Sequence, residues 1–425
     1  MDYKEKALSS STFCLLPFIH MATKTDGDLK LCCRSWPVGN IKDNSIEELW
    51  NSDTYKRIRK QLLSGERAPE CAACWRHEDI DVTSMRQRVN KVRKEYFTVL
   101  DNLNEDCSMP FEIPILEAKL SNFCNLKCRM CHPLDSTSWR EDWQEIQHLM
   151  PNANTSTYEK VLKYDLANKP YVSAFDNNDK FWEEFDRMIP YFDLIEFAGG
   201  EPLIDPIHYK ILHKLKEYGK NISLKYSTNC TILEYKKDNV LELWDHFKNI
   251  NVMVSIDGIN DIYNYIRQLS DYENVKNNIK KISSHHKVNH FGAAITLQVY
   301  NSFIIPQMCD EFVEECNMHI HMHRVNYPTF LDCRIIPKNV KDIIIHELSM
   351  YYDSVDSKTH LNWTDDRKSV TKRHIKDAIA MFNGGDLSKE IPNFIEFSDT
   401  LDKVQNVKYN WRRLLPMLAR EIDGR

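Results

Sequence analysis

The segment that decides the fold reads Asn122-Phe123-Cys124-Asn125-Leu126-Lys127-Cys128-Arg129-Met130-Cys131. It ends a run of strand-forming residues that begins at Ile115. Three thiolates within eight residues can wrap one metal centre, because a tight loop turns the sulfurs to a common side. The spacing does not fit the paired knuckles of a structural zinc site. It fits a [4Fe–4S] cube held at three irons, whose fourth iron stays open to a ligand. The alternative is a cysteine-rich turn or an incomplete zinc knuckle.

Beyond this loop, strand-like and helix-like runs alternate. Strands are predicted at 115–123, 194–198, 222–227, 252–256, 293–299 and 320–325, and helices at 207–218, 240–248, 262–283 and 306–316. Strands that alternate with helices form a parallel sheet with right-handed crossovers. Six such units favour an α/β fold of the partial (β/α)6 barrel type. An open doubly wound sheet is the alternative, and periodicity alone does not decide between them.

Composition narrows the class of protein. The chain has 425 residues, 42% of them hydrophobic, and 56 basic against 62 acidic side chains give a net charge of −6. These values exclude a disordered or fibrous chain and argue against bulk nucleic-acid binding. No apolar run is long enough to span a membrane, and the N-terminus has no secretory signal, so a cytoplasmic protein is expected. In that compartment the 13 cysteines indicate metal ligands more than disulfides.

The cysteine and helix patterns predict four regions. Residues 1–80 form a small metal-stapled unit, and 81–113 form a linker helix and loop. Residues 114–330 form the barrel, with an insertion at about 132–190, and 331–425 form a helical extension. The insertion carries Trp139, Trp143 and Trp182, which are more often core than substrate platform. The insertion and the C-terminal helices are candidates for covering the barrel mouth.

The pattern Cys124-x3-Cys128-x2-Cys131 resembles the signature of the radical S-adenosylmethionine (SAM) superfamily, and the resemblance extends over about residues 114–328. Gly199-Gly200-Glu201-Pro202, at the end of the second strand, resembles the family segment that holds the SAM amino group. Glycine lets the backbone approach a ligand closely, and Glu201 supplies an acceptor for an ammonium. Ser227-Thr228-Asn229-Cys230 resembles the family's Thr-Asn-Gly, with Cys230 in place of glycine.

The resemblance also assigns roles to single residues. It implies that Ser255 and Arg267 contact the SAM carboxylate, and that Asn229 and Asp257 lie near the ribose or carboxylate. A guanidinium can hold a carboxylate bidentately, which suits Arg267. Met130 occupies the position where the family often has an aromatic residue that contacts adenine, although Met130 can equally be packing.

The N-terminal cysteines are Cys14, Cys32, Cys33, Cys71 and Cys74. The Cys71–Cys74 pair is a ligand clasp for iron or zinc. The order of these residues resembles the twitch or SPASM auxiliary-cluster module of some radical SAM enzymes, placed here before the barrel. With either Cys32 or Cys33, the group supplies the four thiolates that close one [4Fe–4S] cluster. Four thiolates also satisfy tetrahedral zinc, which is the alternative.

The resemblance implies an enzyme that cleaves SAM reductively and abstracts hydrogen from a substrate, with electrons from a flavodoxin or ferredoxin. The leading expectation for the substrate is a peptide or protein side chain, and the alternative is a small metabolite or nucleotide-like compound. A non-catalytic metal-binding scaffold is a hypothesis of a different class. His319, His321 and His323 alternate on the sixth strand, so they share one face and could meet a substrate.

Overall fold

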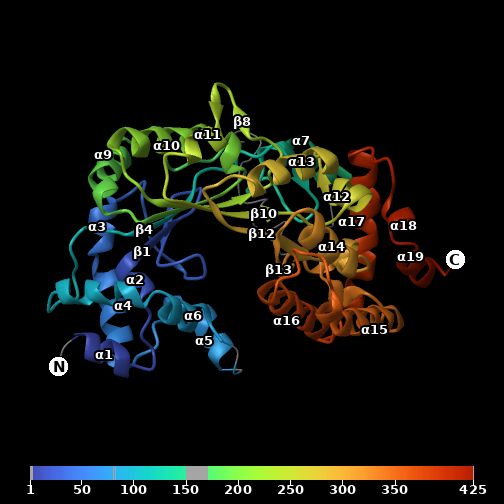
Figure 1. Cartoon of the computed structure of the whole chain (residues 1–425), viewed down its shortest axis with the longest axis horizontal. Coiled ribbons are helices and arrows are strands. Elements are labelled where there is room, and N and C mark those ends of the chain that lie inside the picture. The colour runs from blue at the N-terminus through green and yellow to red at the C-terminus, as the bar shows by residue number, and fades with distance from the viewer. Residues whose placement is uncertain (1–2, 80, 82, 150–170, 425) are drawn as a thin grey trace. The chain divides into compact units, whose positions relative to one another are not determined.

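The computed structural model describes residues 3–79, 81, 83–149 and 171–424 (Figure 1). These residues form two compact units that interleave along the chain. The first comprises Met1–Ser121, Val172–Tyr226 and Glu242–Ile250, and the second comprises Asn122–Tyr171, Ser227–Leu241 and Asn251–Arg425. Residues 150–170, part of the insertion predicted at about 132–190, lie outside the described residues.

The first unit is built on a sheet with the strand order β7-β6-β4-β1-β2-β3. β4 (Ile115–Lys119), β6 (Leu194–Ala198) and β7 (Ser223–Thr228) run parallel. On β6, Ile195 and Phe197 are buried while Glu196 between them is partly exposed, and buried and more exposed residues alternate along β7 as well, as in strands with one apolar face. The three strands predicted for this part of the chain are therefore present.

The N-terminal stretch contributes three further strands to the same sheet. β1 (His20–Thr23) pairs parallel to β4, with Ala22 opposite Glu117. β2 (Asp28–Lys30) and β3 (Pro37–Asn40) follow in antiparallel order. The sequence analysis predicts no strand here. The runs are only three or four residues long and mostly lack the β-branched residues that mark a strand.

Arg59 on α4 (Asp53–Ser64) ties the N-terminal helices together. Its buried guanidinium donates to the carbonyl oxygens of Pro17 at 2.9 Å and Cys107 at 3.2 Å, and lies 4.4 Å from the ring centroid of Trp50. Burial lowers the pKa of Arg59 to about 10. A buried cation requires such carbonyl and aromatic partners, because it has given up water.

The principal helices of the first unit cover segments between the strands. α9 (Asp179–Met188) precedes β6, and α10 (Pro206–Tyr218) connects β6 to β7. α10 begins where the Asp205 carboxylate accepts a hydrogen bond from the N–H of Ile207 at 2.9 Å, and it ends at Gly219, whose φ of 71° suits glycine. Its buried face carries Ile211 and Leu215, as the helical spacing predicts.

The second unit contains β10 (Asn249–Ser255) from Asn251 on, β12 (Val288–Leu297) and β13 (His319–Arg324), in the order β13-β12-β10. β12 and β13 run parallel, with Ala293 opposite Ile320. The helices α12 (Asn260–Ile266) and α13 (Tyr272–Ser283) lie before β12 in the chain. The single helix predicted over 262–283 is therefore wrong, because Arg267–Gln268 between them form the short strand β11.

The C-terminal part of the second unit is helical (orange to red in Figure 1). Its helices are α15 (Lys338–Ser354), α16 (Asp365–Phe382), α17 (Ile391–Val404), α18 (Trp411–Leu414) and α19 (Pro416–Asp423). None of the helices in the described part of the chain combines the length and the apolar character that crossing a bilayer requires.

Candidate metal centre

The loop from Cys124 to Cys131, called here the cluster loop, is held by backbone and side-chain hydrogen bonds within the second unit. Its short strand β5 (Lys127–Cys128) pairs antiparallel with β11, so that Cys128 lies opposite Arg267. The indole N–H of Trp139 donates to the carbonyl oxygen of Cys128 at 3.0 Å. Trp139 is fully buried, as predicted for a core residue, and it also fixes this loop.

The three cysteines of the cluster loop come together in a buried group. Cys124 and Cys128 are 8% and 5% exposed, and Cys131 and Met130 pack against them. The Cys131 thiol donates to Cys128, which lowers the pKa of Cys128, and Arg267 acts in the same direction. This arrangement gives three sulfurs at one place, with one of them predisposed to the thiolate form that binds metal.

Two side chains of the second unit donate to these sulfurs. Arg267 Nη1 lies 3.6 Å from Cys128 Sγ, and Asn229 Nδ2 lies 3.9 Å from Cys124 Sγ. Hydrogen bonds to ligand sulfurs raise the reduction potential of an iron–sulfur cluster. The sequence analysis assigned both residues to SAM alone and missed this contact, which no spacing along the chain indicates.

The carboxylate of Asp257 binds the guanidinium of Arg267. One carboxylate oxygen accepts a hydrogen bond from Arg267 Nε at 2.9 Å and lies 2.7 Å from Nη2 in an ion pair, and the other accepts from the N–H of Thr296 at 2.6 Å. Arg267 has five N–H donors, and the three contacts to Asp257 and Cys128 leave two of them for another acceptor. Ser255 lies in the same unit, at the end of β10.

Cys230 stands where the pattern that it resembles has glycine, and its backbone has a conformation that glycine adopts readily. Its φ of 59° is left-handed, and its N–H donates to the Thr228 hydroxyl oxygen at 2.9 Å. Its carbonyl oxygen accepts from Asn278 Nδ2 at 3.0 Å. The turn that carries Asn229 is therefore fixed by neighbouring side chains although it lacks glycine.

In the first unit, Gly199-Gly200-Glu201-Pro202 follows β6 directly. Gly199 has a φ of 126°, and a Cβ on it would lie 2.7 Å from the carbonyl oxygen of Ser121. That oxygen accepts from the N–H of Gly200 at 2.7 Å. Glu201 is 2% exposed, and its carboxylate accepts from the N–H of Leu203 at 2.9 Å. Only glycine fits the first position of this turn.

The N-terminal cysteines line a small cavity in the first unit. The cysteines in its wall are Cys14, Cys32, Cys71 and Cys74. Cys33 is not among the lining residues: it is exposed, with its Sγ 3.9 Å from Met85 Sδ. Burial and the neighbouring thiols Cys71 and Cys32 raise the pKa of Cys14. A metal must displace these protons, so loading of the cavity is expected to release acid.

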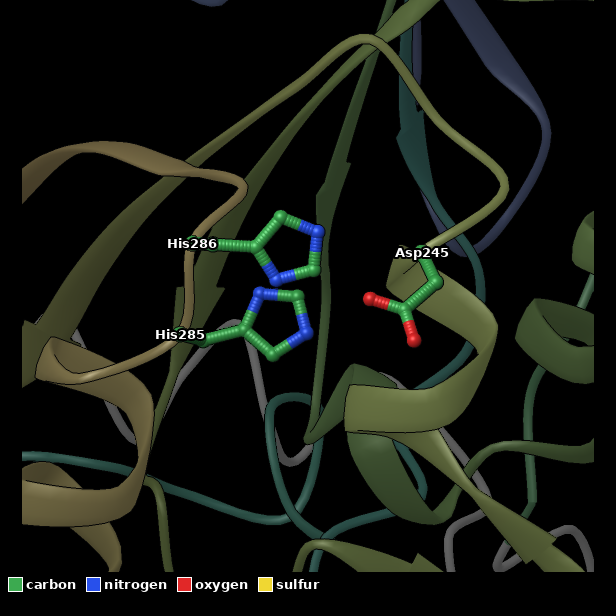
Figure 2. Close-up of side chains that lie close together, drawn as sticks. All are labelled: Asp245, His285 and His286. Atoms are coloured by element: carbon green, nitrogen blue, oxygen red, sulfur yellow. The ribbon is translucent and has the colours of Figure 1, made fainter.

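Histidines form two further groups in the second unit. His321 packs 5.7 Å from His290 and 5.5 Å from His374 between ring centroids, and burial lowers the pKa of His321 to about 3. Figure 2 shows the stacked rings of His285 and His286, 4.9 Å apart. Asp245, also drawn in Figure 2, belongs to the first unit.

Two family models match the chain. Residues 14–75 match an iron–sulfur cluster-binding domain of the SPASM type, and residues 119–299 match the radical SAM superfamily. Residues 119–299 are thus a segment of the radical SAM type. The radical SAM match implies a [4Fe–4S] cluster and SAM, and the SPASM match implies an auxiliary iron–sulfur cluster, as the sequence analysis predicted. The α/β fold expected of a radical SAM enzyme is confirmed as well.

Individual relatives are distant. The probable GTP 3′,8-cyclase of Methanocaldococcus jannaschii is 29% identical over 172 residues, which are 40% of this chain and 45% of that protein. The chain thus spans less than half the length of this relative.

Two solved radical SAM structures share limited similarity with the chain. One, described as native anSMEcpe with bound AdoMet and Cp18Cys peptide, is 15% identical with a TM-score of 0.34, over 57% of this chain and 60% of that one. Streptococcus suis SuiB bound to precursor peptide SuiA is 12% identical with a TM-score of 0.33, over 79% and 69%. Scores this low carry no conclusion about function.

Proposed function

We propose that the protein cleaves SAM reductively at a [4Fe–4S] cluster held by Cys124, Cys128 and Cys131, and uses the product to abstract hydrogen from a substrate. The observation that carries the proposal is the buried group of three sulfurs with two N–H donors aimed at it. Three protein ligands leave one iron free for SAM. When bound, the cluster supplies one electron to the sulfonium, which yields methionine and a 5′-deoxyadenosyl radical.

The chain's own residues bind and orient SAM in this proposal. The two free N–H donors of Arg267 and the hydroxyl of Ser255 hold the SAM carboxylate, while Asn229 and Asp257 lie near it or the ribose. Gly199, Gly200, Glu201 and Pro202 form the turn that receives the ammonium, and Met130 contacts the adenine. The buried Arg267–Asp257 pair is fixed before SAM arrives, so little ordering is needed on binding.

The cavity lined by Cys14, Cys32, Cys71 and Cys74 is proposed to hold the auxiliary cluster. Four thiolates close all four irons, so this cluster relays electrons or supports the fold and does not bind the substrate. Zinc is the competing occupant, because four thiolates also satisfy a tetrahedral zinc ion, and the match to an iron–sulfur cluster-binding domain favours iron. The lining favours Cys32 over Cys33 as the fourth ligand.

The leading substrate proposal is a peptide or protein side chain, on the analogy of auxiliary-cluster enzymes that modify peptides. The similarity to a probable GTP 3′,8-cyclase favours a nucleotide as the second candidate. The electron donor in either case is a low-potential flavodoxin or ferredoxin. A chain with thirteen cysteines, several of them proposed as metal ligands, suits the reducing cytoplasm, where such donors occur.

Anaerobic reconstitution with iron and sulfide, followed by SAM and dithionite, tests the proposal. The wild type should contain about eight irons per chain and release 5′-deoxyadenosine and methionine in equal amounts. Replacing Cys124, Cys128 and Cys131 together by alanine should lower the iron content to about four and abolish both products. Release of 5′-deoxyadenosine by this variant would defeat the assignment.

The substrate class is tested by adding GTP, or the small-molecule or protein fraction of a cell extract, to the same assay. A peptide substrate predicts faster 5′-deoxyadenosine release with the protein fraction only, and transfer of deuterium from labelled protein into the product. Stimulation by GTP alone would establish the nucleotide and exclude the peptide. The Cys124/Cys128/Cys131 variant serves as the blank for each addition.

A further inference from the structure

Arg129 lies within the cluster loop, next to Cys128, and is 1% exposed. Its backbone N–H donates to the carbonyl oxygen of Ile266 at 2.9 Å, and its Nε donates to that of Tyr265 at 2.9 Å. The guanidinium carbon lies 3.6 Å from the centroid of the Tyr265 ring. The side chain is therefore fully enclosed, and its position determines that of the cluster-loop backbone beside it.

Asp402 on α17 is the carboxylate partner of Arg129, 273 residues away along the chain. One oxygen accepts from Arg129 Nη2 and from the Tyr265 hydroxyl, the latter at 2.9 Å. The other oxygen accepts from the N–H of Trp411 at 3.3 Å. Asp402 is 9% exposed, so this ion pair is screened little by water.

A second chain of contacts joins the cluster loop to the same helix end. Lys127 Nζ donates to one oxygen of Asp142, on α7 (Arg140–Leu149), at 2.6 Å. The other oxygen of Asp142 accepts from Nε2 of Gln405, just beyond α17, at 2.9 Å. In the cluster loop, Arg129 is thus bound directly to Asp402, and Lys127 is linked to Gln405 through the carboxylate of Asp142.

Helix α17 is a firm support for these contacts. The Ser398 hydroxyl shares a hydrogen bond of 2.7 Å with that of Tyr300, whose ring packs 5.6 Å from Phe394. The Phe394 ring in turn lies 5.1 Å from Trp411. Buried, mutually packed side chains hold α17 in one position. The contacts with α17 therefore fix the position of the cluster loop.

We propose that Asp402 is a positioning residue for SAM cleavage. Through Arg129 it fixes the loop that carries Cys128 and Cys131, and its charge offsets the guanidinium charge beside the cluster. This inference rests on the function proposed above and adds a role for the C-terminal extension. A buried guanidinium without its carboxylate leaves an uncompensated positive charge, which favours the reduced, more negative state of a neighbouring cluster.

The test compares Asp402→Asn with Asp399→Asn in the reconstituted full-length protein. Asp399 lies one turn earlier on α17 and binds Trp411 and Arg412 but no cluster-loop residue. Both variants should keep the iron content of the wild type. In Asp402→Asn the midpoint potential of the cluster should shift positive, and 5′-deoxyadenosine release should fall at least tenfold. Asp399→Asn should match the wild type in both measurements.

Arg129→Lys separates charge from position. Lysine keeps the positive charge next to Asp402 but lacks the planar fork that reaches Tyr265 and Asp402 together. The potential should stay at the wild-type value while 5′-deoxyadenosine release falls at least tenfold. If Asp402→Asn does not fold, this variant decides the question alone.

The inference would be overturned if Asp402→Asn kept both the midpoint potential and the activity of the wild type. If Asp402→Asn does not fold, wild-type activity in Arg129→Lys would overturn it. In either case the proposed function would stand. A wild type that releases no 5′-deoxyadenosine would instead overturn the proposed function, and this inference with it.

Discussion

Cys32 and Cys33 are neighbours in sequence with different surroundings. Cys32 lines the cavity with Cys14, Cys71 and Cys74, whereas Cys33 is exposed and contacts Met85. Cys32→Ala should therefore lose the auxiliary cluster, lowering the iron content from about eight to about four per chain. Cys33→Ala is the matched control and should keep all the iron, as measured by iron and sulfide analysis.

The reverse result, with iron lost in Cys33→Ala alone, would show that the loop is rearranged when the metal binds. From the sequence the two cysteines could not be told apart, because adjacent residues have the same spacing to every other ligand. Only the path of the loop after β2 decides which sulfur faces the cavity.

For some single residues a local motif indicates which of them lie together, while their roles as ligands remain predictions. The cysteines at 124, 128 and 131 come together as their spacing indicates. Arg129, by contrast, carries no such signal: its partner Asp402 lies 273 residues away, and neither residue belongs to a motif. A buried ion pair between distant segments is visible only once the fold has brought them together.

At the scale of elements, the turn after β6 depends on the missing side chain of Gly199. A Cβ would lie 2.7 Å from the Ser121 oxygen and force the ends of β4 and β6 apart, displacing Glu201. Gly199→Ala should weaken SAM binding at least tenfold, which equals a loss of about 1.4 kcal/mol. Equilibrium dialysis with labelled SAM measures this directly.

Gly219→Ala controls for the backbone cost of replacing a glycine. Gly219 also has a positive φ, 71°, but a Cβ there would meet nothing within 4 Å. This variant should lose about 1 kcal/mol of stability and bind SAM like the wild type. Equal loss of SAM binding in both variants would show that the turn does not position SAM.

Elements with a clear period were predictable, and those determined by distant pairing were not. All six strands predicted from apolar runs are present, because each run is local. β1, β2 and β3 are short and depend on the edge of β4 for their pairing. The break at Arg267–Gln268 likewise exists because β11 pairs with the cluster loop.

At the scale of the whole molecule, we propose that one chain holds two iron–sulfur clusters with different roles. The Cys14, Cys32, Cys71 and Cys74 group supplies four ligands, whereas the cluster loop supplies three. Only the cluster with three protein ligands can bind SAM at iron, since a cluster with four protein ligands has no iron with an open coordination site. The sequence predicted this division, because it follows from counting cysteines in each group.

The most direct test uses the Cys71→Ala/Cys74→Ala variant, in which only the cluster of the radical SAM domain should remain. Its reduced form is examined by electron paramagnetic resonance with SAM labelled with ¹⁷O in the carboxylate and ¹⁵N in the amino group. We expect a cubane signal with hyperfine coupling to both labels, and about four irons per chain. A variant without a cubane signal, or with a signal that labelled SAM leaves unchanged, would contradict this expectation.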